Sequence, residues 1–236
     1  MDLKTRIFEI EAADVQYQAL KNLSFLVPKI EGGFFVIGLA LISYQLSGTG
    51  EMWRKDISFL GKQLKEDIKR KYFLKSWEFV LKNSLYNKRL QNTKIKRLNS
   101  FLKGQSEFFE NISTFEDLKN FNKWLGKLMK QPLDAKTIVF ATKIWGRRLR
   151  VFGKFELFPF DLKIPLDSRW IRLFENMGIK DKKYMQQYIE IISARLNIAP
   201  LHIDGVLWPL IRNESIMNLE DLQQLLVNRL GISSYY

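Results

Sequence analysis

The chain of 236 residues is 46% hydrophobic, and its 38 Lys and Arg residues against 25 Asp and Glu residues give a formal net charge of +13. This hydrophobic content is enough for a buried core and excludes a disordered protein. The excess of positive charge favours a polyanionic partner such as nucleic acid or, less specifically, an anionic membrane surface. The absence of cysteine excludes a disulfide framework and a cysteine-bound iron–sulfur cluster.

No stretch of the sequence predicts a membrane span or a secretory signal. The longest apolar run, FFVIGLALI, is much shorter than the roughly 20 residues that cross a bilayer. The single histidine, His202, does not support histidine-based metal or triad chemistry and is expected to lie in the core or at a helix cap. We therefore expect an intracellular, cytoplasmic protein without a metal ion or a cofactor.

Apolar residues recur with helical spacing along most of the chain. The pattern predicts a first helix over residues 10–26 and, after a break at Gly32-Gly33, a second over residues 34–48 that is apolar nearly all round, as in a central buried helix. Residues 54–103 are heavily basic, which indicates either a surface that faces phosphate or an ordinary solvated surface. The aromatic residues among them recur at helical spacing, which favours core positions for them.

Two helices joined by a short turn are predicted between residues 115 and 152. The second begins with Asp134 as N-cap and Lys136 at the second helical position, and Leu133 and Ile138 form a hydrophobic staple. This helix is predicted to have an apolar face and an opposite, basic face: Ile138, Ala141, Trp145 and Leu149 on the first, and Lys136, Phe140, Lys143, Arg147 and Arg150 on the second. Such a hairpin presents backbone N–H groups and cations to a run of phosphates.

Lys136 and Asp167 each begin a predicted helix. The positive end of the helix dipole, together with Lys143 and Arg147, disfavours the ammonium form of Lys136, and a neutral lysine is a nucleophile. Pro165 breaks the helical pattern, so Asp167 stands where it caps the next helix. A solvated basic face and a simple helix cap remain the alternatives for these two residues.

The rest of the chain is also predicted to be helical, over residues 168–177, 181–196, 200–213 and 218–230. Asp204 and Trp208 are four positions apart and therefore share one face of the third of these helices. No segment with strand periodicity is long enough to contest the assignment, so we predict an all-α protein.

The stretches KTIVFATKIW, which begins at Lys136, and IPLDSR, which contains Asp167, resemble the helix-hairpin-helix DNA glycosylases, and most closely the archaeal 8-oxoguanine glycosylase/lyase family (archaeal GO glycosylase, AGOG). Weaker matches extend from Gln16 to Trp208. The turn QPLDA lacks the glycine-rich turn of the wider superfamily but is similar to that of the archaeal branch. The resemblance implies one unit of two helical lobes over residues 1–236, with the helix-hairpin-helix at residues 115–152 and the active site in the cleft between the lobes.

The resemblance also implies an activity and the residues that perform it. Lys136 would form a Schiff base and Asp167 would be the essential carboxylate of a bifunctional N-glycosylase/AP lyase that removes 8-oxoguanine from DNA. Substrate-binding roles are implied for seven further residues, namely Gln16, Ser43, Trp53, Phe140, Pro165, Asp204 and Trp208. Phe140 and Trp208 would sandwich the extruded base. The sequence also allows plainer roles for five of these residues. They are a polar residue at a helix margin for Gln16, a hydroxyl bonded to its own backbone for Ser43 and a core residue for Trp53, while Trp208 is buried and Asp204 exposed in the plain account of that pair.

The expected partner is damaged DNA containing 8-oxoguanine, single- or double-stranded, and the chain is expected to act as a monomer. A non-catalytic helix-hairpin-helix protein that binds DNA phosphates without turnover is the alternative function. A helical module that binds acidic proteins is supported by the charge alone.

Overall fold

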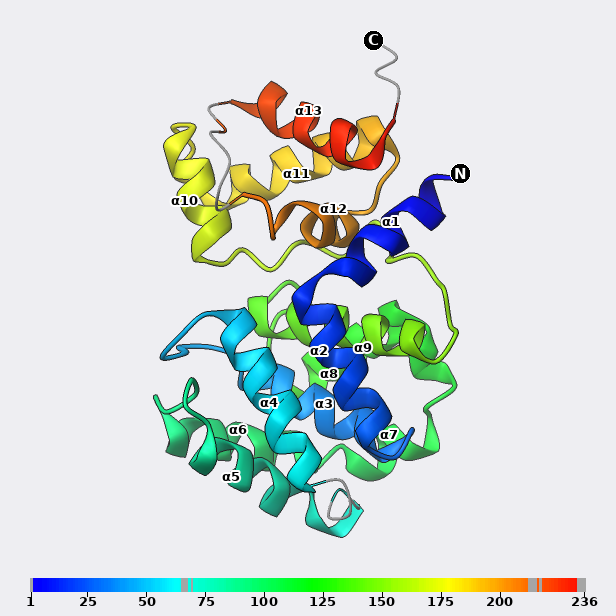
Figure 1. The fold of residues 1–236 in the computed structure, drawn as a ribbon, viewed down its shortest axis with the longest axis vertical. Helices are drawn as coiled ribbons and strands as arrows, with labels where there is room; N and C mark the ends of the chain where they lie inside the picture. Colours follow the sequence, from blue (N-terminus) through cyan, green and yellow to red (C-terminus); the bar gives the residue numbers. More distant parts are fainter. Residues whose placement is uncertain (1, 65–67, 69, 212–215, 217, 233–236) are drawn as a thin grey trace. The chain divides into compact units, whose positions relative to one another are not determined.

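The computed structural model describes residues 2–64, 68, 70–211, 216 and 218–232. These residues form thirteen α-helices and two 3₁₀ helices, without a strand among them, which confirms the all-α prediction (Figure 1). The chain divides into two compact units, unit 1 (Met1–Asp14 and Leu157–Tyr236) and unit 2 (Val15–Glu156). In the described part of the chain, no helix combines the length and the apolar character that crossing a membrane requires. The arrangement as a single two-lobed catalytic unit stays a prediction.

Unit 2 is built around the buried helix α3. Its helices are α2 (Val15–Leu26), α3 (Glu31–Leu41), α4 (Gly50–Leu64), α5 (Phe73–Asn83), α6 (Gln91–Leu102), α7 (Gln105–Glu110), α8 (Leu118–Met129) and α9 (Lys136–Val151), with 3₁₀ turns η1 (Arg70–Tyr72) and η2 (Thr114–Glu116). All side chains from Gly32 to Leu41 are buried, as predicted for a central helix. The helix ends at Leu41 rather than near residue 48, and the chain then turns through Gln45, which has a positive φ of 48°.

Glycines inside α3 allow its neighbours to approach closely. Gly32 and Gly33 were expected to break the chain, but both lie within the helix. A Cβ atom on Gly33 would lie 2.8 Å from the ring of Trp145 on α9, and one on Gly38 would lie 2.3 Å from the ring of Trp77 on α5. The glycines therefore do not interrupt the helix. They leave room for two tryptophan rings that pack directly on the α3 backbone.

The packing of α9 differs from the sequence prediction. Helices α2, α3 and α8 all pack against it, and three cations of the expected basic face are buried, with Lys143 5%, Arg147 2% and Arg150 3% exposed. Arg148 is buried as well, and its guanidinium donates to the carbonyls of Pro28 (3.3 Å) and Lys29 (2.8 Å). Burial lowers the pKa of Arg148 to about 9. The prediction of one packed and one basic face is wrong, because surrounding helices cover the cations too.

The beginning of α9 is also one residue later than predicted. Its N-cap is Ala135 rather than Asp134, so Lys136 occupies the first helical position and the predicted staple positions do not apply. The reason is a turn in which the Ala135 N–H donates to the Pro132 carbonyl (3.0 Å), after which the Ala135 carbonyl accepts from Ile138 (2.8 Å) and Val139. On the preceding helix, the side chain of Asn122 donates to the Leu133 carbonyl (3.3 Å) and to Thr142 Oγ1 (3.1 Å), which ties α8 to this turn and to α9.

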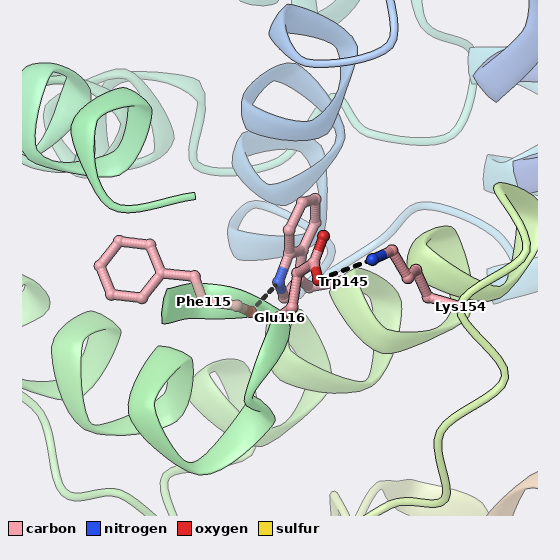
Figure 2. Close-up of polar contacts among 4 residues, drawn as sticks. All are labelled: Phe115, Glu116, Trp145 and Lys154. Atoms are coloured by element: carbon pink, nitrogen blue, oxygen red, sulfur yellow. Dashed lines mark hydrogen bonds and ion pairs between the residues drawn. The ribbon is translucent and has the colours of Figure 1, made fainter. Parts of the chain in front are cut away.

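The middle of α9 and the segment just after its end are attached to η2 (Figure 2). The indole Nε1 of Trp145 donates to the carbonyl of Phe115 at 2.6 Å, and Lys154 Nζ lies 3.0 Å from Glu116 Oε2. The first contact is buried and the second is exposed. A surface ion pair contributes little to stability, so the buried tryptophan bond carries most of this attachment.

Unit 1 contains α1 (Leu3–Ala13), α10 (Ser168–Asn176), α11 (Lys182–Leu196), α12 (Pro200–Leu207) and α13 (Leu219–Leu230). The single helix predicted over residues 10–26 is two helices, because the extended backbone of Asp14 (φ −64°, ψ 133°) separates α1 from α2. Helix α1 packs on α12 and α13, whereas α2 packs on α4 and α9. The helix predicted over residues 200–213 ends at Leu207, and its expected end at Asn213 lies outside the described residues.

His202 lies in the core of unit 1, which is one of the two positions predicted for it. Its Nε2 accepts the Phe158 N–H at 3.0 Å, so the ring proton is on Nδ1, which donates to Glu11 Oε1 at 3.0 Å. A Cβ atom on Gly205 would lie 2.2 Å from that carboxylate oxygen, so only glycine permits this approach. The histidine thus links α1, α12 and the segment after Leu157.

Two of the cations in the basic stretch of residues 54–103 are buried rather than available to phosphate. Arg54 and Lys94 have almost no exposed surface. Lys94 Nζ donates to Asn87 Oδ1 and lies 5.1 Å from the centre of the Tyr44 ring. Burial lowers the pKa of Lys94 to about 8. Residues 65–67 and 69 of this stretch lie outside the described residues.

Lys94 makes the stability of the fold depend on pH in the alkaline range. The ordinary pKa of a lysine is 10.5. Between pH 8 and pH 10.5 the unfolded chain therefore binds a proton at Lys94 that the folded chain does not. The free energy of unfolding therefore rises with pH in this window. The melting temperature of the wild type should rise by a few degrees relative to Lys94→Met between pH 8 and pH 10. Lys96→Met, which removes an exposed lysine from the same helix, should show no such trend, and a parallel response of both variants would contradict the assignment.

Candidate active site

Lys136 is the first residue of α9, and its side chain is exposed. No side chain caps this helix end, so the amine stands beside the positive end of the helix dipole. Lys143, the other amine of this helix, is only 5% exposed. Lys136 is therefore the amine of α9 that a substrate can reach.

A polar cluster holds the start of α9 in place. Arg97 Nη2 on α6 donates to Gln131 Oε1 at 2.7 Å and to Thr137 Oγ1 at 2.6 Å, and the threonine hydroxyl donates to the same glutamine at 3.0 Å. Burial lowers the pKa of Arg97. Thr137 follows Lys136 directly, so the cluster fixes the backbone from which the candidate nucleophile extends.

Phe140 lies one helical turn after Lys136, where its ring is half-buried. The guanidinium carbon of Arg54 lies 5.0 Å from the centre of the ring, within the range of a cation–π contact. Arg54 itself is buried and belongs to α4. The contact places a cation on one face of the Phe140 ring.

Ser43 and Trp53 form a connected pair. The Ser43 hydroxyl donates to the Leu39 carbonyl at 2.7 Å and accepts from the indole Nε1 of Trp53 at 2.8 Å. The plainer role foreseen for Ser43, a hydroxyl bonded to its own backbone, is therefore present. Because the only hydroxyl proton is used, Ser43 can offer a ligand only an acceptor lone pair. Trp53 is completely buried, and Gln16 is buried on α2.

The candidate residues of unit 1 converge on Asp167. As predicted, Asp167 is the N-cap of α10, where its Oδ1 accepts the N–H groups of Arg169 (2.9 Å) and Trp170 (3.2 Å). Its other oxygen, Oδ2, accepts the indole Nε1 of Trp208 at 2.8 Å. Asp204 is buried and its Oδ1 accepts the indole Nε1 of Trp170 at 2.6 Å. The plain account with a buried Trp208 and an exposed Asp204 is therefore wrong, because Asp204 is buried and Trp208 is only half-buried.

Three residues of this region were missed by sequence reasoning. The guanidinium carbon of Arg169 lies 3.7 Å from the centre of the Trp208 ring, and Trp170 joins the cap of α10 to Asp204. Gln186 on α11 donates to the Ile164 carbonyl at 2.8 Å and accepts its N–H at 3.4 Å, which fixes the chain before the buried Pro165. The proximity of Arg169 and Trp170 to the predicted cap was the only available signal, and Gln186 had none.

The structure brings together some of the predicted catalytic residues and some of the predicted substrate-binding residues. Asp167 contacts Trp208 directly and is connected to Asp204 through Trp170, while Ser43 contacts Trp53. Lys136 and Phe140 are neighbours on α9, against which the helix of Gln16 packs. Among the residues that the structure describes, no group of three His, Asp or Glu side chains could hold a metal ion.

A family model described as AGOG: N-glycosylase/DNA lyase matches residues 2–235. The chain belongs to this family. An N-glycosylase/DNA lyase of Methanopyrus kandleri is 34% identical over 84% of this chain and 80% of its own, and one of Methanococcus maripaludis is 32% identical over 89% of this chain and 84% of its own. The resemblance recognised from the sequence is confirmed, and so is the assignment to the N-glycosylase/DNA lyases, a class of DNA-repair enzymes.

A solved structure has the same fold. It is an 8-oxoguanine DNA glycosylase from Pyrobaculum aerophilum in complex with 8-oxoguanosine, with a TM-score of 0.75 and 24% sequence identity, covering 95% of this chain and 89% of the other. At this identity the match supports the helical architecture. The roles of the individual site residues stay predictions.

Removal of the Ser43 hydroxyl should destabilise the fold. Ser43→Ala leaves the buried Nε1 of Trp53 without its acceptor, so the free energy of unfolding should fall by about 1–3 kcal/mol in a denaturant titration. Ser47→Ala changes an exposed serine and should cost less than about 0.5 kcal/mol. Equal losses in the two variants would mean that the Ser43–Trp53 bond contributes nothing.

Proposed function

We propose that the chain removes 8-oxoguanine from DNA and cleaves the resulting abasic site through a Schiff base on Lys136, with Asp167 as the essential carboxylate. The observation that carries the proposal is the exposed amine at the first position of α9, in a chain of the AGOG family. The base is suggested by the relative from Pyrobaculum aerophilum, which is an 8-oxoguanine DNA glycosylase. The proposed partner is damaged DNA, single- or double-stranded, and the proposed active form is a monomer.

The covalent route begins with attack by Lys136. Its Nζ forms a bond to C1′ of the damaged nucleotide, and the bond from C1′ to the base breaks with its electron pair leaving on the base. The attacking amine loses one proton, and the C1′–O4′ bond of the sugar then breaks while O4′ takes up a proton. This ring opening leaves a protonated imine between Nζ and C1′. The protonated imine makes a hydrogen on C2′ acidic, and its loss expels the 3′ phosphate by β-elimination, which cuts the strand.

Asp167 supplies the negative charge for this route. Its carboxylate stabilises the positive charge that develops on the sugar and accepts a proton from the attacking amine. Each carboxylate oxygen has two lone pairs, so the bonds to the cap N–H groups and to Trp208 leave acceptor capacity. These bonds hold the carboxylate in one orientation before substrate arrives, which is the preorganisation that electrostatic catalysis requires.

The remaining candidates would recognise the base. Phe140 and Trp208 would stack on it, with Arg54 on one face of the first ring and Arg169 on one face of the second. Gln16, Ser43, Asp204 and the Pro165 carbonyl are proposed as its hydrogen-bonding partners. Ser43 could act only as an acceptor, and Trp53 would act mainly by holding the Ser43 hydroxyl.

Borohydride reduction tests the Schiff base on Lys136. It should trap the wild type on a duplex that contains 8-oxoguanine, because an imine is reducible, and Lys136→Gln should abolish both trapping and strand scission while DNA binding persists. The control is Lys127→Gln, which removes an exposed lysine from the last turn of α8 and should retain trapping. Full scission by Lys136→Gln would refute the covalent-lysine mechanism.

Asp167→Asn tests the charge of the carboxylate. Asparagine caps a helix about as well as aspartate, so the melting temperature should change little, while excision should fall by roughly 10²- to 10⁴-fold in single-turnover assays. The amide introduces one complication, because its NH₂ group would face the donor Nε1 of Trp208. The double variant Asp167→Asn with Trp208→Phe removes this donor–donor contact. Recovery of excision in the double variant to the level of Trp208→Phe alone would show that the contact, not the lost charge, caused the defect.

A further inference from the structure

Arg169 and Trp208 form a stacked pair whose geometry is set entirely within unit 1. The guanidinium carbon of Arg169 lies 3.7 Å from the centre of the indole, and Arg169 Nη1 also donates to the Trp208 carbonyl at 3.4 Å. Arg169 therefore contacts both the ring and the backbone of Trp208. This combination restrains both the position of Trp208 and the rotation of its side chain.

The other end of the indole is held by Asp167. Trp208 Nε1 donates to Asp167 Oδ2 at 2.8 Å, while Asp167 Oδ1 accepts the backbone N–H of Arg169 at 2.9 Å. Arg169, Asp167 and Trp208 thus form a closed ring of contacts. Trp208 follows α12 as its C-cap and its ring packs at the margin of the unit 1 core, so the opposite end of the side chain is fixed as well.

We propose that Arg169 is a positioning residue that makes Trp208 a one-sided stacking surface for the damaged base. The inference rests on the proposed function. A planar guanidinium at 3.7 Å occupies one face of the indole, so a base can stack only on the other face. Arg169 thereby selects the face on which the base binds, and it holds the ring so that Nε1 still points to Asp167. The cap bonds to Asp167 Oδ1 involve the backbone N–H groups of Arg169 and Trp170, so replacement of the arginine side chain leaves them in place.

This arrangement predicts that Arg169 contributes to base recognition rather than to phosphate attraction or to strand cleavage. Arg169→Ala exposes the second face of the indole and frees its rotation, so 8-oxoguanosine should bind about tenfold more weakly in a calorimetric titration. The nucleoside carries no phosphate, so lost attraction to DNA cannot cause this change. Excision of 8-oxoguanine from a duplex should fall by a similar factor. Scission of a pre-formed abasic site, which has no base to stack, should stay within about twofold of the wild type.

Two further variants separate the alternatives. Arg169→Lys keeps the charge but loses the planar group, so it should also bind the nucleoside more weakly while the salt dependence of DNA binding stays unchanged. Arg172→Ala removes an exposed arginine one turn further along α10 and should leave nucleoside binding and the ratio of excision to scission unchanged. Melting temperatures of all variants are measured in parallel.

The outcomes are distinct. An unchanged affinity for 8-oxoguanosine and an unchanged ratio of excision to scission in Arg169→Ala would overturn the inference. The inference would also be overturned if excision, scission and melting temperature all fell together in both Arg169 variants. The arginine would then only stabilise the fold. A wild type that neither binds the nucleoside nor excises the base would instead end the proposed function, and the inference with it.

Discussion

The burial of α9 is the constraint on which the rest of unit 2 depends. Helices α2, α3 and α8 pack against it, and two glycines of α3 bring their neighbours into close contact, one of them being Trp145 of α9 itself. A helix covered in this way cannot shift without disrupting the core. Its first residue, Lys136, is nevertheless exposed, so the candidate nucleophile is a solvent-accessible amine on a backbone held by tertiary packing.

The cations of α9 show how a strongly basic chain can also be a compact one. Part of its formal charge of +13 lies inside unit 2 rather than on its surface. Arg148 shows one use of a buried cation, because it donates to two carbonyls in the segment between α2 and α3 and attaches that segment to α9. Net charge therefore overstates the surface that can meet DNA, and the exposed lysines matter more than the total.

In unit 1 a single carboxylate links stability to the proposed chemistry. Asp167 caps α10 with one oxygen and orients the indole of Trp208 with the other. An ordinary N-cap needs only the first of these contacts. The second contact aligns an aromatic ring with the carboxylate, and Asp204 reinforces the arrangement through Trp170, which is itself bonded to the cap. The local capping motif is thus extended by long-range contacts from α12 into a preorganised group of side chains.

The sequence by itself determined the helical character of the chain, its family and the placement of Lys136 and Asp167 at helix starts. The family was recognised from the resemblance carried by the stretches that contain Lys136 and Asp167. The helical character and the two helix starts depend instead on periodicity and on capping residues within a few positions, which are properties of neighbouring residues in the chain. Even there the start of α9 was misplaced by one residue, because a turn closed by Pro132 competed with Asp134 as the cap.

Only the tertiary structure decided which charged residues are buried and which side chains meet. Arg147 and Lys94 are residue types that usually lie on the surface, yet both are buried in this fold. A single sequence does not show which segments will cover them. The same holds for Arg169 and Trp208, which are 39 residues apart and meet because α10 and the end of α12 fold into one unit. Contacts at such separations depend on how helices pack, and helical periodicity specifies a face but not its partner.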